Sequence, residues 1–68
     1  MRDVTIRDES IRLGQLLKLA DLVDAGGDAK ALLADGAVTV KGEPETRRGR
    51  QLRRGDVVES RGEHVRIT

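Results

Sequence analysis

Apolar residues in the first part of the chain recur with the period of an α-helix. Within residues 12–23, four of them fall at positions i, i+3, i+4 and i+7, which lie on one face of a helix. They are Leu13, Leu16, Leu17 and Ala20. Ser10 lies just before this segment, where a hydroxyl commonly caps a helix. The pattern predicts a first helix over about residues 12–23, which ends before the glycine pair Gly26 and Gly27.

A second, shorter helix is predicted over about residues 28–35. Asp28 suits its start, because a carboxylate is favourable at the positive end of the helix dipole. The apolar face of this helix consists of Ala29, Leu32 and Leu33, and Gly36 suits a left-handed C-terminal cap. A helix of this length is not stable alone in water, so we expect it to pack on the first helix.

The second half of the chain changes to the alternating period of β-strands. Residues 38–40 alternate and lead into Lys41 and Gly42, whose glycine can adopt the positive φ of a tight turn. Pro44 cannot donate a hydrogen bond to a sheet, so residues 43–46 form at most an edge strand.

Three further short strands are predicted: residues 4–6 and 64–67 show the same alternation, and residues 57–58 are two valines that follow a turn. Turns are expected at residues 54–56 and 61–62, whereas residues 47–54 contain only Leu52 as an apolar anchor. The chain is predicted to form a single domain over residues 1–68, of the α+β class, with two short packed helices and a small antiparallel sheet.

Charge is concentrated in one segment of this 68-residue chain, whose formal net charge is only +1. Residues 41–54 hold six basic residues against Glu43 and Glu45. The basic residues are Lys41, Arg47, Arg48, Arg50, Arg53 and Arg54. Such a cluster is typical of proteins that bind phosphate-rich partners, because the guanidinium fork matches phosphate oxygens. A solvated charged loop is the alternative interpretation.

Composition excludes several kinds of protein. The chain has no Cys, which excludes a disulfide scaffold and fits a reducing, cytoplasmic setting. No apolar run approaches the ~20 residues of a membrane span. The chain also has no Phe, Trp or Tyr, and modules that bind single-stranded nucleic acids usually stack bases on such side chains. Nucleic-acid recognition would therefore depend on phosphates, 2′-hydroxyls and shape.

Candidate catalytic or metal-binding residues are few and isolated. His64 is the only histidine, with no second ligand at a suitable spacing. Ser10 has no partner that would activate it as a nucleophile. Asp21 and Asp24 fit a solvated helix face, and the glycine pair lacks the Gly-Lys-Ser/Thr that completes a nucleotide-binding loop. We expect no enzyme, no metal and no cofactor.

The order of motifs along residues 11–58 is more informative than any single motif. The motifs are Arg12-Leu13, Leu16-Leu17, the glycine corner, Ala29-Lys30, Leu32-Leu33, residues 35–40 (Asp-Gly-Ala-Val-Thr-Val), Gly42, Leu52, Gly55-Asp56 and Val57-Val58. Together they resemble the RNA-binding domain named after ribosomal protein S-four. The similarity is greatest to small stand-alone bacterial members, which have a run like residues 45–50 of this chain (Glu-Thr-Arg-Arg-Gly-Arg).

This resemblance implies a non-catalytic protein that binds structured RNA, either ribosomal or transfer RNA. Such a protein could also associate with a ribosomal particle. By position, Arg12 and Lys30 match basic residues of the family at the start of helix one and on helix two, and Lys41 matches the residue before the turn glycine. The chain departs from the family pattern at three places. Gly14 stands where Asp is common, Ala25-Gly26 where Ser-Arg is common, and Lys41 where Asn is usual.

The glycine pair offers one possible replacement for the missing corner contact. Backbone N–H groups of Gly26 and Gly27 could face a phosphate at the start of the second helix, although a plain helix-breaking corner explains them as well. The complete set of predicted RNA-binding residues is Arg12, Gly26, Gly27, Lys30, Lys41, Arg47, Arg48, Arg50, Arg53 and Arg54. Neutralising four or five phosphates predicts a salt slope of about −3 to −4.

Two other functions are compatible with the sequence. One is a small protein-interaction adaptor, in which acidic residues of the N-terminal half dock a basic partner. These residues are Asp21, Asp24, Asp28 and Asp35. The other is binding to duplex DNA, which is less favoured because the short second helix carries only Lys30 for contacts in a major groove.

Overall fold

The computed structural model describes residues 1–24 and 26–68. This part of the chain contains two helices, α1 (Leu13–Leu19) and α2 (Gly26–Ala34). Its strands are β1 (Arg2–Val4), β2 (Ser10–Arg12), β3 (Val38–Val40), β4 (Glu43–Pro44), β5 (Gln51–Arg53), β6 (Val57–Ser60) and β7 (Glu63–Ile67). The predicted α+β class is confirmed.

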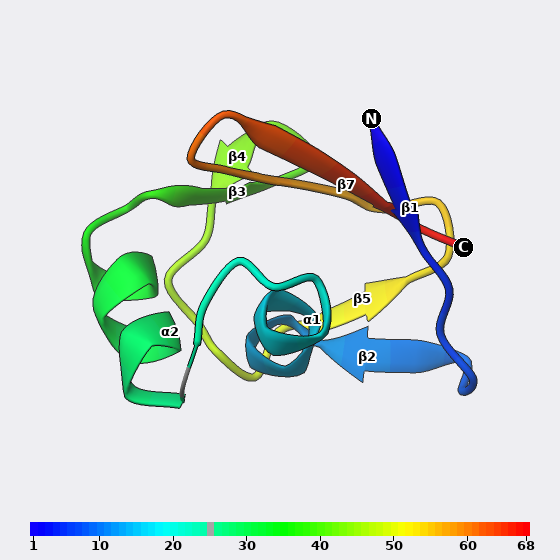
Figure 1. The fold of residues 1–68 in the computed structure, drawn as a ribbon, viewed down its shortest axis with the longest axis horizontal. Helices are drawn as coiled ribbons and strands as arrows, with labels where there is room; N and C mark the ends of the chain where they lie inside the picture. The colour runs from blue at the N-terminus through cyan, green and yellow to red at the C-terminus, as the bar shows by residue number, and fades with distance from the viewer. Residues whose placement is uncertain (25) are drawn as a thin grey trace.

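The strands form two sheets. The larger has the order β1-β7-β6-β3-β4, and β2 pairs with β5 in a separate two-stranded sheet. Figure 1 shows the larger sheet on one side of the helices, with the β2–β5 pair beside α1. All neighbouring strands are antiparallel except β1 and β7, which run parallel, so the prediction of a wholly antiparallel sheet was wrong in this detail.

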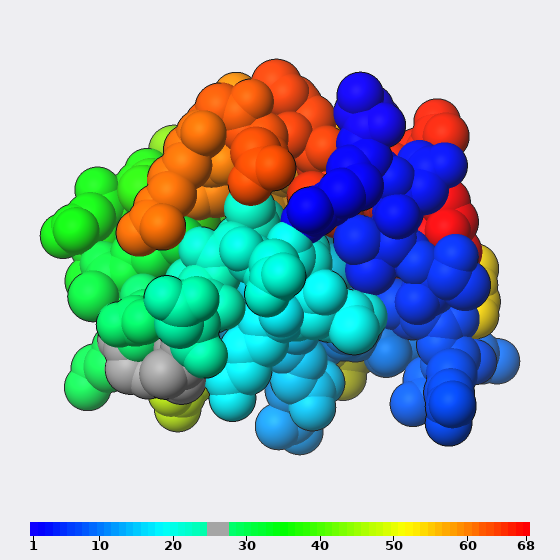
Figure 2. All heavy atoms as spheres, viewed as in Figure 1, coloured from blue at the N-terminus to red at the C-terminus, as the bar shows by residue number. Residues whose placement is uncertain are grey.

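The first strand also differs from its predicted position. It spans Arg2–Val4 and not residues 4–6, because its partners are Val65 to Ile67 near the other end of the chain. Ile6 lies beyond the strand and enters the core, and its N–H donates to the carbonyl of Thr68 at 3.1 Å. Figure 2 shows this N-terminal segment (blue) beside the cyan segment that contains α1 and the loop after it. Alternation alone did not reveal a pairing between two distant segments.

One hydrophobic core lies between the helices and the larger sheet. The predicted apolar faces of both helices are buried in it, as are the inward positions of β3, β6 and β7. Leu52 of β5 is also fully buried, as expected for the anchor of the arginine-rich segment. The two helices pack against each other, which confirms the expectation for the short second helix.

The first helix ends at Leu19, four residues before its predicted end. Asp21 adopts a left-handed conformation with φ of 61°, which stops the helix. The N–H of Leu22 donates to the carbonyl of Leu17 at 2.9 Å, and the N–H of Asp21 donates to that of Lys18 at 3.1 Å. These bonds form a Schellman motif, usually built on glycine. An aspartate at this position gave no termination signal in the sequence.

This early end also changes the interpretation of the nearby carboxylates. Asp21 and Asp24 were expected on a solvated face of the first helix, but both lie in the loop that follows it. They remain exposed.

The start of α1 is capped by another loop and not by Ser10, which belongs to β2. The N–H of Leu13 donates to the carbonyl of Arg50 at 2.8 Å, and the N–H of Gly14 donates to that of Arg48 at 3.0 Å. Two of the N–H groups that lack a partner within the helix are therefore satisfied by the arginine-rich segment. These two hydrogen bonds fix the arginine-rich segment beside the first turn of α1.

The second helix begins at Gly26, two residues earlier than predicted. Gly26 and Gly27 therefore belong to its first turn and do not form a corner before it, while Ala25 of the predicted corner lies outside the described residues. Gly36 has a φ of 73° and ends the helix as predicted, with its N–H donating to the carbonyl of Leu33 at 3.1 Å.

The predicted tight turns are present. Lys41 and Gly42 have φ values of 53° and 84°, and Arg61 and Gly62 have values of 53° and 80°. Two successive residues with positive φ match the right-handed twist of the strands that they join. Neither helix in the described parts of the chain is long and apolar enough to cross a membrane.

Candidate nucleic-acid interface

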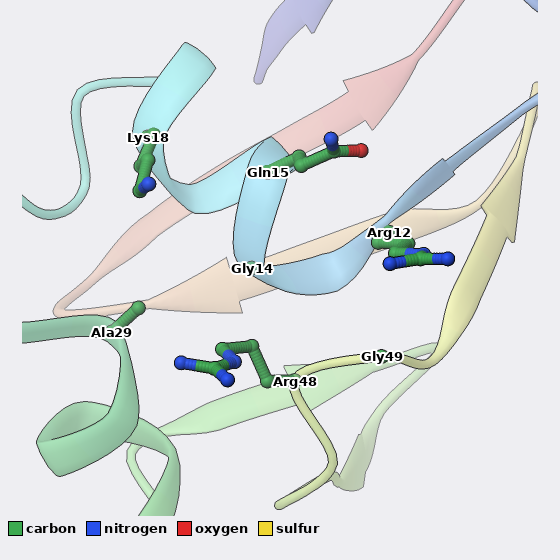
Figure 3. A pocket seen from close by; sticks show the side chains of 7 residues that line it. All are labelled: Arg12, Gly14, Gln15, Lys18, Ala29, Arg48 and Gly49. Atoms are coloured by element: carbon green, nitrogen blue, oxygen red, sulfur yellow. The ribbon is translucent and has the colours of Figure 1, made fainter. Parts of the chain in front are cut away.

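Three cationic residues line a depression at the N-terminal end of α1. This basic depression has a volume of about 330 Å³. The described residues that line it are Arg12, Gly14, Gln15, Lys18, Ala29, Arg48 and Gly49, and none of them is acidic. Figure 3 shows Arg12 and Lys18 from the β2–α1 segment and Arg48 from the facing loop. Three cationic residues thus line one open site.

Gly14 allows the arginine-rich loop to lie close against α1. A Cβ atom on Gly14 would stand 2.5 Å from Cγ and 3.2 Å from Cδ of Arg48. These distances are too short for an undisturbed contact, so any other residue at this position would displace the Arg48 side chain. The sequence left open whether this glycine merely costs little or permits a close approach, and the structure shows the close approach.

A buried carboxylate also holds this loop in place. Glu45 is 7% exposed and accepts hydrogen bonds from the guanidinium groups of Arg47, at 3.2 Å, and Arg50, at 3.0 Å. The backbone N–H groups of Thr46 and Arg47 also donate to it, at 3.0 and 3.1 Å. Figure 3 shows the part of the loop at Arg48 and Gly49 that this network supports.

The hydrogen bonds from Arg47 and then Arg50 lower the pKa of Glu45 to about 2, from an ordinary value of 4.5. The same contact with Glu45 raises the pKa of Arg47. Glu45 therefore stays ionised at neutral pH and offsets one of the two arginine charges. Arg47 and Arg50 shape the loop, whereas Arg48 points into the basic depression.

The remaining predicted residues lie elsewhere. Lys41, in the β3–β4 turn, forms an ion pair with Asp56 at 3.2 Å. The guanidinium of Arg54 donates to the carbonyl of Ile6 at 2.9 Å and ties the β5–β6 turn to the N-terminal segment. Arg53 is exposed on β5.

Of the predicted cationic residues, all of which the structure describes, only Arg12 and Arg48 line the basic depression. Lys30 is exposed on α2, the helix whose Ala29 lines this depression. Gly26 and Gly27 form the first turn of that helix. RNA contact by any member of the set stays a prediction.

Sequence reasoning missed Gln15 and Lys18. Both are exposed on α1, and with Arg12 they are spaced three positions apart. Residues at this spacing lie along one side of a helix. The spacing of these polar positions was visible in the sequence, but the prediction of this helix was based on its apolar face alone.

Acidic residues gather at a different depression, of about 340 Å³, beside the loop after α1. Its lining includes Asp21, Asp24, Asp28 and Asp35 together with Arg61. Within residues 1–24 and 26–68, no group of three or more potential ligands is arranged to hold a metal ion. Positive and negative side chains thus gather at separate depressions.

Comparisons with known proteins show which proteins the whole chain is similar to. A family model described as the S4 domain matches residues 4–68. A protein of Bacillus subtilis named "Probable ribosome maturation protein RlbA" is 52% identical over 59 residues, which cover 87% of this chain and 83% of that protein. The crystal structure of the 30S ribosomal protein S4e from Thermoplasma acidophilum superimposes with a TM-score of 0.66 at 30% identity. That similarity covers 88% of this chain and 32% of the ribosomal protein.

Proposed function

Because this chain belongs to the S4 domain family, we propose that it binds structured RNA through the basic depression, without catalysing a reaction. The family resemblance inferred from the sequence is confirmed. The observation that carries the proposal is that Arg12, Lys18 and Arg48 line one open site whose described lining contains no carboxylate.

The chemistry of the site suits the phosphates of a folded backbone. Arg12 and Arg48 each present a planar fork of donors to phosphate oxygens, and Lys18 adds a mobile point charge. The capping bonds to α1 and the contacts with Glu45 support the loop before any ligand arrives, which reduces the entropic cost of binding. Phosphate contacts position the protein on an RNA without reading its sequence.

Ribosomal RNA is the favoured RNA class. The Bacillus subtilis relative is named as a probable ribosome maturation protein, and the structural neighbour is a protein of the 30S subunit. These names support a ribosomal particle as the partner, and hence a cytoplasmic location, more than they support transfer RNA.

The competing function is the protein-interaction adaptor. Its supporting observation is that Asp21, Asp24, Asp28 and Asp35 converge on the acidic depression. Under this alternative, the aspartates carry the interaction and the cations of the basic depression are dispensable.

Charge reversal distinguishes the two functions. The variant Arg12→Glu/Arg48→Glu leaves the Glu45 contacts in place, whereas reversal of Arg47 and Arg50 would also disrupt the loop. Arg61→Glu is the matched control, because Arg61 is exposed and lines the acidic depression.

The measurement is co-sedimentation with purified bacterial ribosomal subunits, with transfer RNA as competitor. We expect the wild type and Arg61→Glu to sediment with subunits and the double variant to remain in the supernatant. Sedimentation of the double variant at the wild-type level would contradict the proposal. Efficient displacement by transfer RNA would contradict the ribosomal assignment alone.

A further inference from the structure

A second hollow adjoins the basic depression and has a different character. This side groove has a volume of about 690 Å³ and lies between the N-terminal segment and α1. Gln15 and Lys18 line both sites, so the two are contiguous along one side of the helix. A ligand held in the basic depression can therefore extend into the side groove.

The side groove contains apolar surface that the core leaves exposed. Leu19 is 57% exposed, and within the described residues the only other exposed large hydrophobic side chain is that of Met1. Ile11 of β2 is half-buried and contributes to the same lining. Leu19 follows Gln15 by four positions, which places the two side chains on neighbouring turns of one helix face. An isolated exposed leucine is ordinary, but this one stands next to a cationic site.

We propose that the side groove receives an unpaired nucleotide of the RNA whose backbone is held in the basic depression, an inference that rests on the proposed function. A duplex offers phosphates to the basic depression, but its stacked bases cannot reach apolar surface beside it. A bulged or junction nucleotide leaves the stack and exposes both faces and edges of its base. Such a nucleotide matches an apolar wall placed directly beside phosphate-binding cations.

The side chains that line the side groove can contact the base face, the base edge and the phosphate of a nucleotide. Leu19 and Ile11 offer aliphatic contact to the face of a base, in a chain that has no aromatic side chain for stacking. The amide of Gln15 can donate to and accept from a base edge. Lys18 lines both sites, so its ammonium group can contact the phosphate of the same nucleotide.

Charge favours a nucleotide over a basic peptide as the occupant. Arg7 and Lys18 line the side groove against one carboxylate, that of Asp8. Arg12 and Arg48 add positive charge in the adjoining depression. An anionic ligand with an apolar face therefore suits the combined site.

The test compares three fluorophore-labelled RNA hairpins with the same stem. One is fully paired, one carries a single-nucleotide bulge, and one carries the same bulge without its base. Covering roughly 40 Å² of the Leu19 side chain corresponds to about fivefold tighter binding. We expect the wild type to bind the bulged hairpin about fivefold more tightly than the other two. Leu19→Ala should remove this difference, while Arg48→Gln should weaken binding to all three RNAs alike.

Several outcomes would overturn the inference. Equal wild-type affinity for all three hairpins would exclude a nucleotide-binding groove. Equal affinity for the two bulged hairpins would show that the protein recognises a bend and not a base. Retention of the difference by Leu19→Ala would show that the base does not lie against Leu19 in the side groove. Failure of the proposed function is distinguishable, because Arg48→Gln would then leave all affinities unchanged.

Discussion

Replacement of one arginine in the basic depression provides a quantitative prediction. Arg48→Gln removes one positive charge and keeps a polar, though shorter, side chain. Arg48 makes no ion pair or side-chain hydrogen bond within residues 1–24 and 28–68, and its loop is held by backbone bonds and by Glu45. The substitution should therefore preserve the fold and remove one phosphate contact.

The expected magnitude follows from counterion release. Each neutralised phosphate contributes about 0.7 to 0.9 to the slope of log K against log salt concentration. The three cations of the basic depression predict a slope of about −2 to −3. This is less steep than the −3 to −4 expected from the sequence, because Glu45 and Asp56 partly neutralise other members of the predicted set.

For Arg48→Gln, the slope should become less steep by about 0.7 to 0.9, and binding at about 0.1 M salt should weaken about fivefold to eightfold. The assay is fluorescence anisotropy of labelled RNA over a series of salt concentrations. The label must be on the RNA, because the protein has no aromatic reporter. Arg61→Gln is the matched control and should leave the slope unchanged. Equal changes in slope for both variants would refute the assignment of phosphate binding to this site. They would indicate that the RNA is attracted to any exposed positive charge on the protein.

Four other substitutions test the structural argument. Gly14→Ala should displace the Arg48 side chain and weaken RNA binding, while circular dichroism shows a retained fold; wild-type affinity would contradict the close approach of Arg48. Glu45→Gln should lower thermal stability at neutral pH. Because the folded pKa of Glu45 lies below its ordinary value, the wild-type advantage should be complete above about pH 4.5 and disappear as the pH falls towards 2, and a pH-independent difference would contradict this. Leu17→Ala should cost about 2 to 5 kcal/mol of folding free energy and lower the Tm by about 8 °C or more, so an unchanged melt would place Leu17 outside the core. Ser60→Ala should leave stability unchanged or raise it by about 1 kcal/mol, because the fully buried Ser60 hydroxyl has no hydrogen-bond partner in the described structure; a lower Tm would reveal a partner.

The helices, hairpin turns and core were predictable because they depend on local patterns. The apolar stripe through Leu13 and Leu17 and the left-handed glycine at Gly36 each have a signal within a few residues. The end of α1 lacked such a signal, since Asp21 occupies a position where glycine is usual. The parallel pairing of β1 with β7 joins distant segments, and nothing in the local alternation specified its direction.

The candidate site was only partly predictable for a related reason. The sequence identified a run of arginines but could not separate those that hold the loop from those that face outward. The ion pairs of Glu45 distinguish the two kinds of arginine. Glu45 binds Arg47 and Arg50, whereas Arg48 lines the basic depression. The contribution of Lys18 depends on the docking of this loop against α1, which is a tertiary contact.

The most direct test of the account is binding of a labelled ribosomal RNA hairpin at two salt concentrations, against a matched DNA duplex and an unstructured RNA. The experiment compares three proteins, which are the wild type, Arg12→Glu/Arg48→Glu and Arg61→Glu. Circular dichroism confirms that each is folded. The account predicts that the wild type and Arg61→Glu prefer the structured RNA, that salt weakens this binding, and that the double variant loses it. Equal, weak binding of the wild type to all three nucleic acids, or undiminished binding by the double variant, would contradict the account.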